Sequence, residues 1–458
     1  MNAIQNIIQN VISWAYAGKQ LDEYEAKSLA RQKELTLLLE YFEGRQKRPL
    51  KTASGRDYNV MANLTGVIIN RTVSMLVGGG VSYSIEDDSA QQYIDEVYKA
   101  NRGDILLHDL VQYGSIYGTA YLKIIPNGKT WKGKTYPRLI ALNPYNMTIT
   151  TAPDDIENIT AYTNRWNDGD TAWREITELR EGRWYVRLER AASDTKGNWE
   201  MQSEVVFEYE FCPIQHTKNL PSAGNVYGLS DIEGVIELQD KYNAAQSDIN
   251  VILGHFAFPL RYTSGGRLPR TTLSDGTQAV DISPQNIVEF QSENARINVA
   301  EMQSDLSSSR AFVSDVRRDL FDIASTVDTE TLRQNASQIT NFGLRVMFKE
   351  ELAKNNTKQM LYGVLLDTVN ENLLMMAGLP NDAGQIIWGD PLPTNPLEEI
   401  QSLTADKALG IVSNQTIAQT RNYDWEKESA RIAEETTASN ALGGNMLRDF
   451  LAGRNTNA

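Results

Sequence analysis

The chain of 458 residues is long enough for two or three domains, and its 41% hydrophobic residues suffice to bury sizeable cores, which excludes wholesale disorder. No stretch approaches the ~20 apolar residues of a membrane-spanning helix, so we expect no membrane partner. The net charge of −15 is the opposite of what a protein needs to grip DNA through many phosphates. If DNA is a partner, we expect it to slide past the protein.

Residue types that bind metals or form disulfides are scarce. The single cysteine, Cys212, excludes an intrachain disulfide framework and fits synthesis in a reducing cytoplasm. His108, His216 and His255 are far apart in the sequence, so we interpret each as a packed or surface side chain. These residues predict a protein without a metal site and without a cofactor.

Helices separated by glycines are predicted for the N-terminal part of the chain. Apolar residues recur at helical spacing in residues 4–12 beside a face of Asn and Gln, which indicates a docking helix rather than a membrane-surface helix. A charged helix is predicted over residues 21–43 and another over 60–77, each followed by glycine. A third covers residues 88–117 and leads into a strand-like run at 120–125.

Between residues 120 and 217 the hydrophobic pattern changes from helical spacing to short strand-like runs. Short runs there alternate or are rich in β-branched and aromatic residues, and turn clusters separate them, which predicts an antiparallel meander. We interpret the tryptophans of this region as core or cross-strand packing rather than as a base-stacking surface. They are Trp166, Trp173, Trp184 and Trp199.

One segment of the meander matches a nucleotide-binding pattern. Residues 128–135, GKTWKGKT, satisfy the phosphate-loop pattern GxxxxGK[ST]. A phosphate-binding loop must open a helix, so that backbone amides and the helix dipole face the phosphates. Here Pro137 and a strand-like run follow Lys134 at once, and we therefore predict a β-hairpin turn. The alternative is a nucleotide-hydrolysing packaging protein that uses this turn.

No arrangement of residues typical of a hydrolase stands out. The sequence has no Gly-x-Ser-x-Gly segment, and acidic pairs such as Asp87-Asp88 and Glu350-Glu351 are interpreted as solvated faces of an acidic chain. We therefore predict that the protein has no catalytic residues and is not an enzyme.

The helical period returns at residue 230. Residues 230–233, Ser-Asp-Ile-Glu, form a predicted capping box before a helix that continues to about residue 256. A small β-containing insert follows, and a second helix is predicted over residues 304–325. A polar segment, 326–335, then precedes a predicted helix of about 40 residues that ends at Gly378.

A helix of this length is unusual in a compact monomer. At ~1.5 Å per residue it would be about 60 Å long, and long helices with apolar stripes need surface from another subunit. The residues from 395 onward are predicted to be helical, with Pro396 at the first position of a helix. The fold class that these segments predict is α+β.

Several short segments, in a fixed order, resemble those of a known family. They are YFEG at residues 41–44, the helix and strand over 63–83, YGSIYGTAY at 113–121, YGLSD at 227–231, LQDKYN at 238–243, NAS at 335–337, GIVSNQT at 410–416 and RIAEE at 431–435. Their order and spacing, over nearly the whole chain, resemble the siphovirus-type portal proteins of tailed bacteriophages. Two details depart from the family's pattern: one extra residue precedes Gly44, and Gln338 stands where glycine is usual.

The resemblance implies a portal fold with named parts. In this sequence they are an α/β wing (1–227), a first stem helix (228–256), a small β-containing clip (257–303), a second stem helix (304–325), a tunnel loop (326–336), the long helix and return strand of the wing (337–394) and a helical crown (395–458). We use these names below for the same residues.

The resemblance also implies a function. Members of the family form a dodecameric ring at one capsid vertex, through which double-stranded DNA is packaged, retained and ejected independently of its sequence. The implied partners are the large terminase subunit, the head–tail adaptor, and the major capsid and scaffolding proteins. The implied location is the virion, after synthesis in the host bacterial cytoplasm. A minor head protein without a channel is the remaining alternative.

The tunnel loop supplies the predicted DNA-facing residues, because in the family this junction projects toward the axis where DNA passes. Its side chains here are polar, which suits brief contact with phosphates without readout of bases. They are Thr329, Arg333, Gln334, Asn335 and Gln338, the last just inside the long helix. One arginine per subunit would place a ring of positive charge in an acidic passage. A solvent-exposed linker without DNA contact is the alternative.

Overall fold

The computed structural model describes residues 23–50, 57–192, 199–257, 260–264, 271–272, 276, 278–279, 294, 296–300, 306–332, 341–380, 384–392, 396–420 and 423–435. The chain divides into two compact units, one of residues 1–334 and 347–391 and the other of residues 335–346 and 392–458. The predicted docking helix at 4–12 lies outside the described residues. Across the described ranges, no helix is both long enough and apolar enough to span a membrane.

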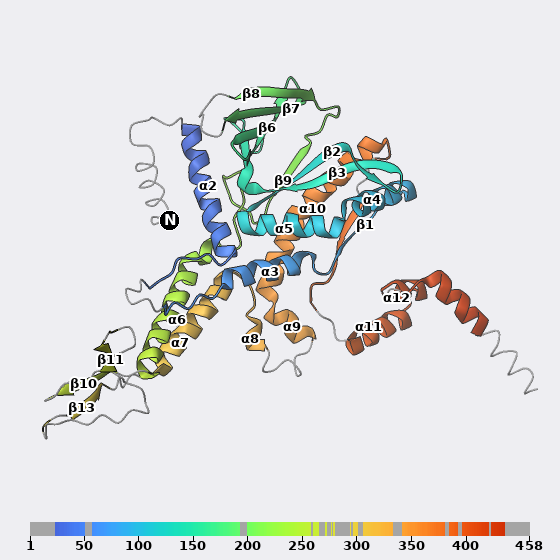
Figure 1. The fold of residues 1–458 in the computed structure, drawn as a ribbon. Helices are drawn as coiled ribbons and strands as arrows, with labels where there is room; N and C mark the ends of the chain where they lie inside the picture. Colours follow the sequence, from blue (N-terminus) through green and yellow to red (C-terminus); the bar gives the residue numbers. More distant parts are fainter. Residues whose placement is uncertain are drawn as a thin grey trace, which may run out of the picture. The chain divides into compact units, whose positions relative to one another are not determined.

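The N-terminal part of the first unit is helical (Figure 1). Its helices are α2 (Glu23–Phe42), α3 (Leu64–Val77), α4 (Asp88–Asn101) and α5 (Gly103–Tyr117). The first two confirm the predicted helices, but the single helix predicted over 88–117 is wrong. Arg102 takes left-handed backbone angles, φ 55° and ψ 58°, which ends α4 and lets α5 begin at Gly103.

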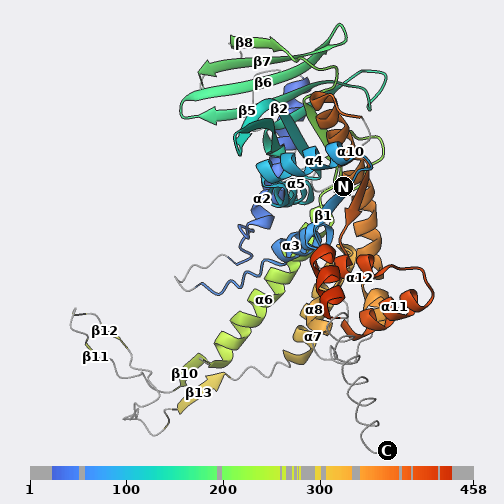
Figure 2. The ribbon, with the colours of Figure 1, turned by 90° about the vertical axis from the view of Figure 1, so that its right-hand side faces the viewer.

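Two antiparallel sheets follow where one meander was predicted. In the smaller sheet, β2 (Thr119–Trp131) lies between β3 (Lys134–Leu142) and β9 (Ile214–Lys218). The larger sheet is a meander of β4 (Met147–Thr151), β5 (Ile159–Asp168), β6 (Thr171–Arg180), β7 (Arg183–Ala192) and β8 (Glu200–Val206). Figure 2 shows β5 to β8 side by side. A small core with residues from both sheets joins them; it contains Tyr121, Met147, Ile149, Tyr162 and Ile214.

The tryptophans of the larger sheet pack as predicted. Trp166 and Trp173 are cross-strand partners, and their rings stack with centroids 6.5 Å apart. Trp184 is buried, and the Arg174 guanidinium lies 4.3 Å from the centroid of the Trp199 ring.

Residues 128–135 form the predicted hairpin turn. Trp131 and Lys134 pair across it, and the turn residues Lys132 and Gly133 have φ angles of 49° and 80°. Two positive φ angles are typical of a type I′ turn, whose twist matches that of the flanking strands, and glycine adopts the second position without strain. Lys134 opens β3 instead of a helix, and its ammonium lies 3.4 Å from the Glu96 carboxylate. The segment therefore lacks the helix that a phosphate loop requires.

Helices α6 (Ile236–Ala257) and α7 (Leu306–Ile323), which lie within the two predicted stem segments or extend one residue past them, lie side by side (Figure 1). A buried polar stripe on α6, one residue per turn, binds backbone N–H groups of the segment before α3 and the first N–H of α3. The stripe consists of Gln239, Asn243 and Ser247. Their side-chain oxygens accept hydrogen bonds from the N–H groups of Leu64, Ala62 and Val60 at 3.1, 3.1 and 3.0 Å. The stripe thus pairs backbone groups that have no neighbouring strand.

The capping box predicted at residues 230–233 is wrong. A 3-10 turn, η2 (Glu233–Val235), precedes α6, and the Ser230 hydroxyl accepts from the N–H of Ile232 at 3.3 Å instead of from Glu233. The same hydroxyl donates to the carbonyl of Ser115 in α5 at 3.1 Å. The Ser230 hydroxyl thus accepts from Ile232 and donates to α5 at the same time, so it joins the segment before α6 to α5 without forming a capping box.

Between the stem helices, the described residues of the predicted clip form two short antiparallel pairs. β10 (Leu260–Ser264) pairs with β13 (Arg296–Ala300), and β11 (Thr271–Thr272) pairs with β12 (Gln278–Ala279). The β-containing insert predicted after the first stem helix is confirmed to this extent.

The helix predicted over about 40 residues is two helices in the part that the structure describes. α9 (Asn341–Met347) and α10 (Lys349–Ala377) are separated at Phe348, with φ −89° and ψ 9°. The break lies close to the boundary between the two compact units, so most of α9 packs in one unit and α10 in the other. α10 ends as predicted at Gly378, which takes a left-handed φ of 67°. β14 (Gln385–Trp388) then pairs with β1 (Val81–Ser84).

The second unit contains α11 (Pro396–Ala408), α12 (Asn414–Thr420) and a helical stretch over residues 425–435. Pro396 is the first residue of α11, as predicted, because a proline there loses no intrahelical hydrogen bond.

α10 runs through the core of the first unit. Its residues Tyr362, Leu365, Leu366, Val369 and Leu373 are buried in one cluster with side chains of α3, α4, α5 and β2. Burying a large apolar side chain contributes about 1.5–3 kcal/mol. This stripe therefore fixes the rotation of α10 about its axis, and with it the direction of the polar residues in its first turns.

Candidate functional site at the junction of α7 and α10

The predicted tunnel loop begins where α7 ends. The structure describes its residues 326–332, which include the short helix α8 (Thr329–Leu332). Thr329 is exposed, and its hydroxyl oxygen accepts a hydrogen bond from Arg71 Nη2 at 2.9 Å. The other predicted DNA-facing residues, Arg333, Gln334, Asn335 and Gln338, lie outside the described residues.

Both backbone groups of Val327 are held by side chains of other helices. The carbonyl accepts from Arg71 Nη1 of α3 at 2.7 Å, and the N–H donates to the Glu351 carboxylate of α10 at 2.8 Å. Glu351 is 4% exposed, so its predicted place on a solvated face is wrong: position 351 belongs to the buried stripe of α10. Burial raises the pKa of Glu351, and the bond from Val327 opposes that rise.

Arg317 of α7 forms a further attachment. It binds both carboxylate oxygens of Asp328, at 2.6 and 3.0 Å, and the Glu330 carboxylate at 2.9 Å. The hydrogen bond from Arg317 lowers the pKa of Asp328, and the same contact raises the pKa of Arg317 above its ordinary range. The guanidinium carbons of Arg71 and Arg317 lie 5.1 and 5.5 Å from the ring centroid of buried Phe321. Three helices thus hold the start of the tunnel loop.

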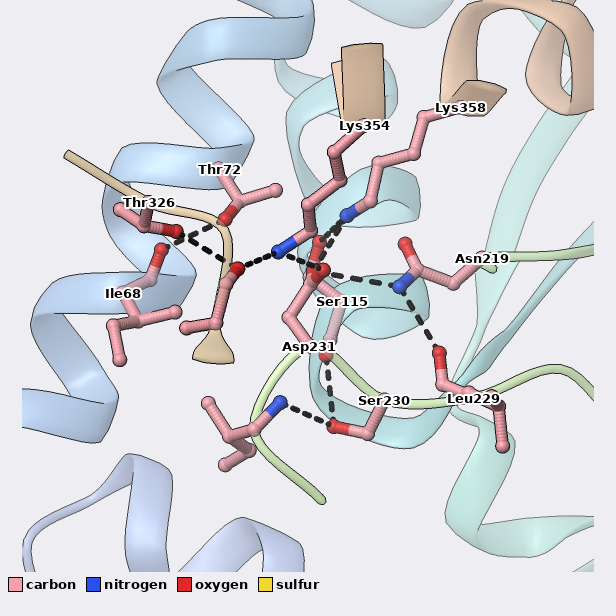
Figure 3. A network of polar contacts seen from close by, with 12 residues as sticks. Ile68, Thr72, Ser115, Asn219, Leu229, Ser230, Asp231, Thr326, Lys354 and Lys358 are labelled. Carbon is pink, nitrogen blue, oxygen red and sulfur yellow. Dashed lines mark hydrogen bonds and ion pairs between the residues drawn. The ribbon is translucent and has the colours of Figure 1, made fainter. Parts of the chain in front are cut away.

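A buried ion cluster lies next to this segment (Figure 3). The Asp231 carboxylate binds two ammonium groups of α10: Lys354 Nζ lies 2.8 Å from Oδ1 and Lys358 Nζ 2.5 Å from Oδ2. Lys354 also donates to the carbonyl of Ala324 at 2.8 Å, and Lys358 to the hydroxyl of Ser115 at 3.2 Å. Two lysines one turn apart therefore join α10 to the end of α7, to α5 and to the segment before α6.

Burial and charge act against each other in this cluster. Burial alone would raise the pKa of Asp231, but the two ammonium groups outweigh it and hold that pKa well below its usual range. Burial lowers the pKa of Lys358 to about 8, and the attraction of Asp231 opposes it. Both groups are therefore charged at neutral pH, inside a core where an unpaired charge would be costly.

Two of the segments that carry the sequence resemblance meet at Asp231. Gly118 ends α5 with a left-handed φ of 84°, and a Cβ on Gly228 would overlap the Gly118 carbonyl oxygen. The Asp231 N–H donates to the carbonyl of Ser115 at 3.0 Å. The close approach that the two glycines permit brings Asp231 to α10.

Asp231, Lys354 and Lys358 are absent from the site residues that the sequence predicts. One signal for them exists: Lys358 falls on the buried stripe of α10, four residues before Tyr362. A lysine in such a stripe requires a buried partner of opposite charge. The sequence does not reveal that partner, because Asp231 is 127 residues away along the chain.

A surface pocket of about 570 Å³ opens beside Lys354. Apolar Leu220 and Ile323 line it together with Glu350 and Thr357 of α10. The pocket gives solvent access to the edge of the cluster, whereas Lys358 is fully buried behind it.

His216 is packed, as predicted. Its Nδ1 lies 2.9 Å from the Tyr162 hydroxyl, and its ring stacks on Tyr121 with centroids 5.9 Å apart. Burial lowers the pKa of His216 to about 4 and raises that of the nearby Cys212 thiol to about 12. Among the residues described, no group of three or more His, Cys, Asp and Glu side chains is placed to hold a metal ion.

The amino-acid sequence matches the family model described as "Phage portal protein, SPP1 Gp6-like" over residues 21–441. The chain belongs to this phage portal protein family. A comparison with curated protein sequences finds no significant match. The predicted tunnel loop and the ion cluster both lie within the matched residues of this portal protein.

Solved structures with similar folds come from gene transfer agent particles. A chain from the "Neck of empty GTA particle computed with C6 symmetry" has a TM-score of 0.50 and 14% identity, covering 86% of this portal protein and 94% of that chain. A chain from the "Virion of native gene transfer agent (GTA) particle" has a TM-score of 0.43 and 14% identity, covering 85% and 99%. One from the "Neck of native GTA particle computed with C12 symmetry" has a TM-score of 0.43 and 13% identity, with the same coverage. At 14% identity, the first similarity concerns the fold alone.

Proposed function

We propose that this protein is the ring-forming subunit of a portal at one capsid vertex of a phage-like particle. Double-stranded DNA passes through the ring during packaging and ejection, and the protein is not an enzyme. The observation that carries the proposal is the match to the portal family from residue 21 to residue 441. The net charge of −15 supports it, because an acidic conduit does not retain the phosphates that must move through it.

Assembly into a ring, dodecameric in the virion, is part of the proposal. Large apolar side chains on the helices of the first unit are exposed in the single chain: Met360 and Val364 on α10 are 67% and 68% exposed, and Phe312 on α7 is 56% exposed. Apolar surface of this kind is typical of subunit contacts. The similar neck structure was computed with C6 symmetry, which also favours a ring.

Within the ring, the tunnel loop faces the DNA. Its start is bound by Arg71, Arg317 and Glu351, which supports a loop that is firmly attached at residues 327–330. Arg333 then contributes one positive charge per subunit, and DNA contact by such charges weakens as salt rises.

The proposed partners follow from the family. They are the large terminase subunit during packaging, the head–tail adaptor afterwards, and the major capsid and scaffolding proteins around the ring. The proposed location is the portal vertex of the virion, after synthesis in the host cytoplasm. A nucleotide-hydrolysing function finds no support in the hairpin at residues 128–135, where Lys134 opens a strand.

The assembly is tested by mass measurement and negative-stain microscopy of the purified protein. We expect rings with a central hole and a mass of about a dozen subunits. A stable monomer at micromolar concentration and ordinary salt would refute the ring. Particles without a central hole would favour a minor head protein instead.

The tunnel loop is tested by Arg333→Glu in a DNA-packaging assay with assembled rings. We expect normal rings that package or retain less DNA, with a weaker dependence on salt. The control is Arg318→Glu, which reverses an exposed charge on α7, where Arg318 pairs with Asp315. Wild-type packaging and retention by the Arg333 variant would show that this arginine makes no important contact with DNA.

A further inference from the structure

The two lysines that bind Asp231 occupy different surroundings. Lys358 is fully buried, and its second contact is Ser115 of α5. Lys354 is 10% exposed at the edge of the pocket, and its second contact is the carbonyl of Ala324. Of the two, Lys354 is the lysine that contacts the chain leading into the tunnel loop.

Ala324 lies in the turn that ends α7 and begins that chain. Ser325 follows with a left-handed φ of 48°, and the N–H of Thr326 donates back to the carbonyl of Phe321 at 3.0 Å. The last carbonyls of a helix have no intrahelical partner and lie at the negative end of its dipole, so an ammonium group there is favourable. Lys354 therefore caps the C-terminus of α7 from another helix.

Asp231 lies on the other side of the same ammonium group, two residues before η2 and five before α6. Lys354 Nζ thus connects three elements through bonds of 2.8 Å: the segment that leads into α6, the turn that follows α7, and α10 itself. We propose that Lys354 is the positioning residue that couples the two stem helices to the tunnel loop. The role of that loop in DNA handling rests on the function proposed above; the coupling itself does not.

The surroundings of Lys354 make this connection reversible. If its ammonium moves away, Lys358 still neutralises Asp231, so no buried carboxylate is left unpaired. The pocket of about 570 Å³ admits water to the released ammonium. Removing the Lys358 ammonium instead would break its contacts with Asp231 and Ser115 deep in the core. Substitution of Lys354 therefore tests the coupling, and substitution of Lys358 tests the stability of the core.

Hydrogen exchange measured on the assembled wild-type and Lys354→Met proteins tests the coupling. We expect peptides covering residues 324–332 to exchange about tenfold faster in the variant, because the turn after α7 loses its cap. Peptides covering α5 should be unchanged, since Lys358 and Ser115 are untouched. Lys354→Arg should restore most of the protection, because the pocket has room for a guanidinium that bridges the same oxygens.

Two matched controls identify a merely structural effect. Lys349→Met removes an exposed lysine of the same helix and should leave exchange unchanged throughout. Lys358→Met should raise exchange in α5 as well as at the loop. Unchanged exchange at residues 324–332 in Lys354→Met, or an equal rise in α5, would overturn the proposal.

A packaging assay on the same rings tests the consequence for DNA. We expect Lys354→Met rings to begin packaging but to retain less DNA than wild type. Raised exchange at the loop together with wild-type packaging and retention would overturn the coupling to DNA handling. Failure of the wild-type ring to bind or pass DNA would overturn the proposed portal function instead, and the exchange result would still decide the structural role of Lys354.

Discussion

Replacing Asp231 by asparagine measures how much the buried ion cluster contributes to stability. Asp231→Asn keeps the size of the side chain but removes the negative charge bound to Lys358, which is fully buried 2.5 Å away. Breaking a buried ion pair in this way costs about 3–5 kcal/mol, because the remaining charge has no compensation. We therefore expect the free energy of unfolding at pH 7 to fall by about 3–5 kcal/mol, roughly a 10²- to 10⁴-fold change in the folding equilibrium constant.

The loss of unfolding free energy in Asp231→Asn should become smaller as the pH rises from 6 to 8. The pKa of Lys358 is about 8 in the folded protein and 10.5 in the unfolded chain. Because the Asp231 carboxylate raises the folded value, its removal lowers that value further. Between the folded and unfolded pKa values the unfolded chain binds more protons, so stability rises with pH, by up to about 1.4 kcal/mol per unit. In the variant this rise begins below pH 8, whereas in the wild type it begins near pH 8. The difference in stability between the two proteins should therefore shrink from pH 6 to pH 8.

Urea titration followed by circular dichroism, at equal protomer concentration, measures both quantities. Asp248→Asn is the matched control, because Asp248 is an exposed carboxylate of α6, and we expect it to change stability by less than about 0.5 kcal/mol. A loss below about 1 kcal/mol for Asp231→Asn would contradict a charged, buried pair. A difference that grows with pH would show that Lys358 is not the group left uncompensated.

Other outcomes follow from the same structure. Asn243→Leu should lower the free energy of unfolding by about 2–4 kcal/mol, because it leaves the N–H of Ala62 and the amide oxygen of Gln46 without their partner; a loss under about 1 kcal/mol in a urea titration would contradict the polar stripe. Lys134→Ala should leave ring formation and DNA packaging unchanged, and an ATP hydrolysis activity that this variant abolishes would contradict a non-enzymatic hairpin. Stability should fall as pH drops from 6.5 toward 4, by up to about 3 kcal/mol, because His216 takes up its proton at a pKa of about 4 in the fold and 6.5 in the unfolded chain. His216→Gln should reduce this dependence of the unfolding free energy on pH, and an unchanged dependence would show that other groups cause it.

Helices and turns that depend on nearby residues could be predicted from the sequence. Short runs rich in β-branched and aromatic residues predict a strand-rich region between residues 120 and 217, and a proline three residues after Lys134 predicts a hairpin rather than a phosphate loop. Gly378 predicts the end of α10, since glycine takes the left-handed conformation that closes a helix. Each of these signals acts over a few residues, and the structure confirms each of them.

Predictions failed where a distant contact overrides a local preference. Ser230 is suited to cap a helix, but its oxygen accepts from the N–H of Ile232 while its O–H donates to the carbonyl of Ser115 in α5, and a 3-10 turn follows. Glu351 follows Glu350 in an acidic chain, yet it lies on the buried stripe of α10, where its carboxylate accepts from the N–H of Val327. Arg102 interrupts a helical pattern in a left-handed conformation for which the sequence offers no signal beyond the glycine after it.

The sequence by itself determined the α+β class, the acidic character of the chain, most of the helices and strands, and the resemblance to portal proteins, whose match over residues 21–441 shows the family. These properties depend on local periodicity, on composition, or on motifs in a fixed order. Only the tertiary structure decided that Asp231 binds Lys354 and Lys358, residues more than 120 positions away, and that Arg71 and Arg317 bind Val327 and Asp328 at the start of the predicted tunnel loop. A charge enters a protein core only if an opposite charge arrives with it, and which charge arrives is set by the packing of the whole chain.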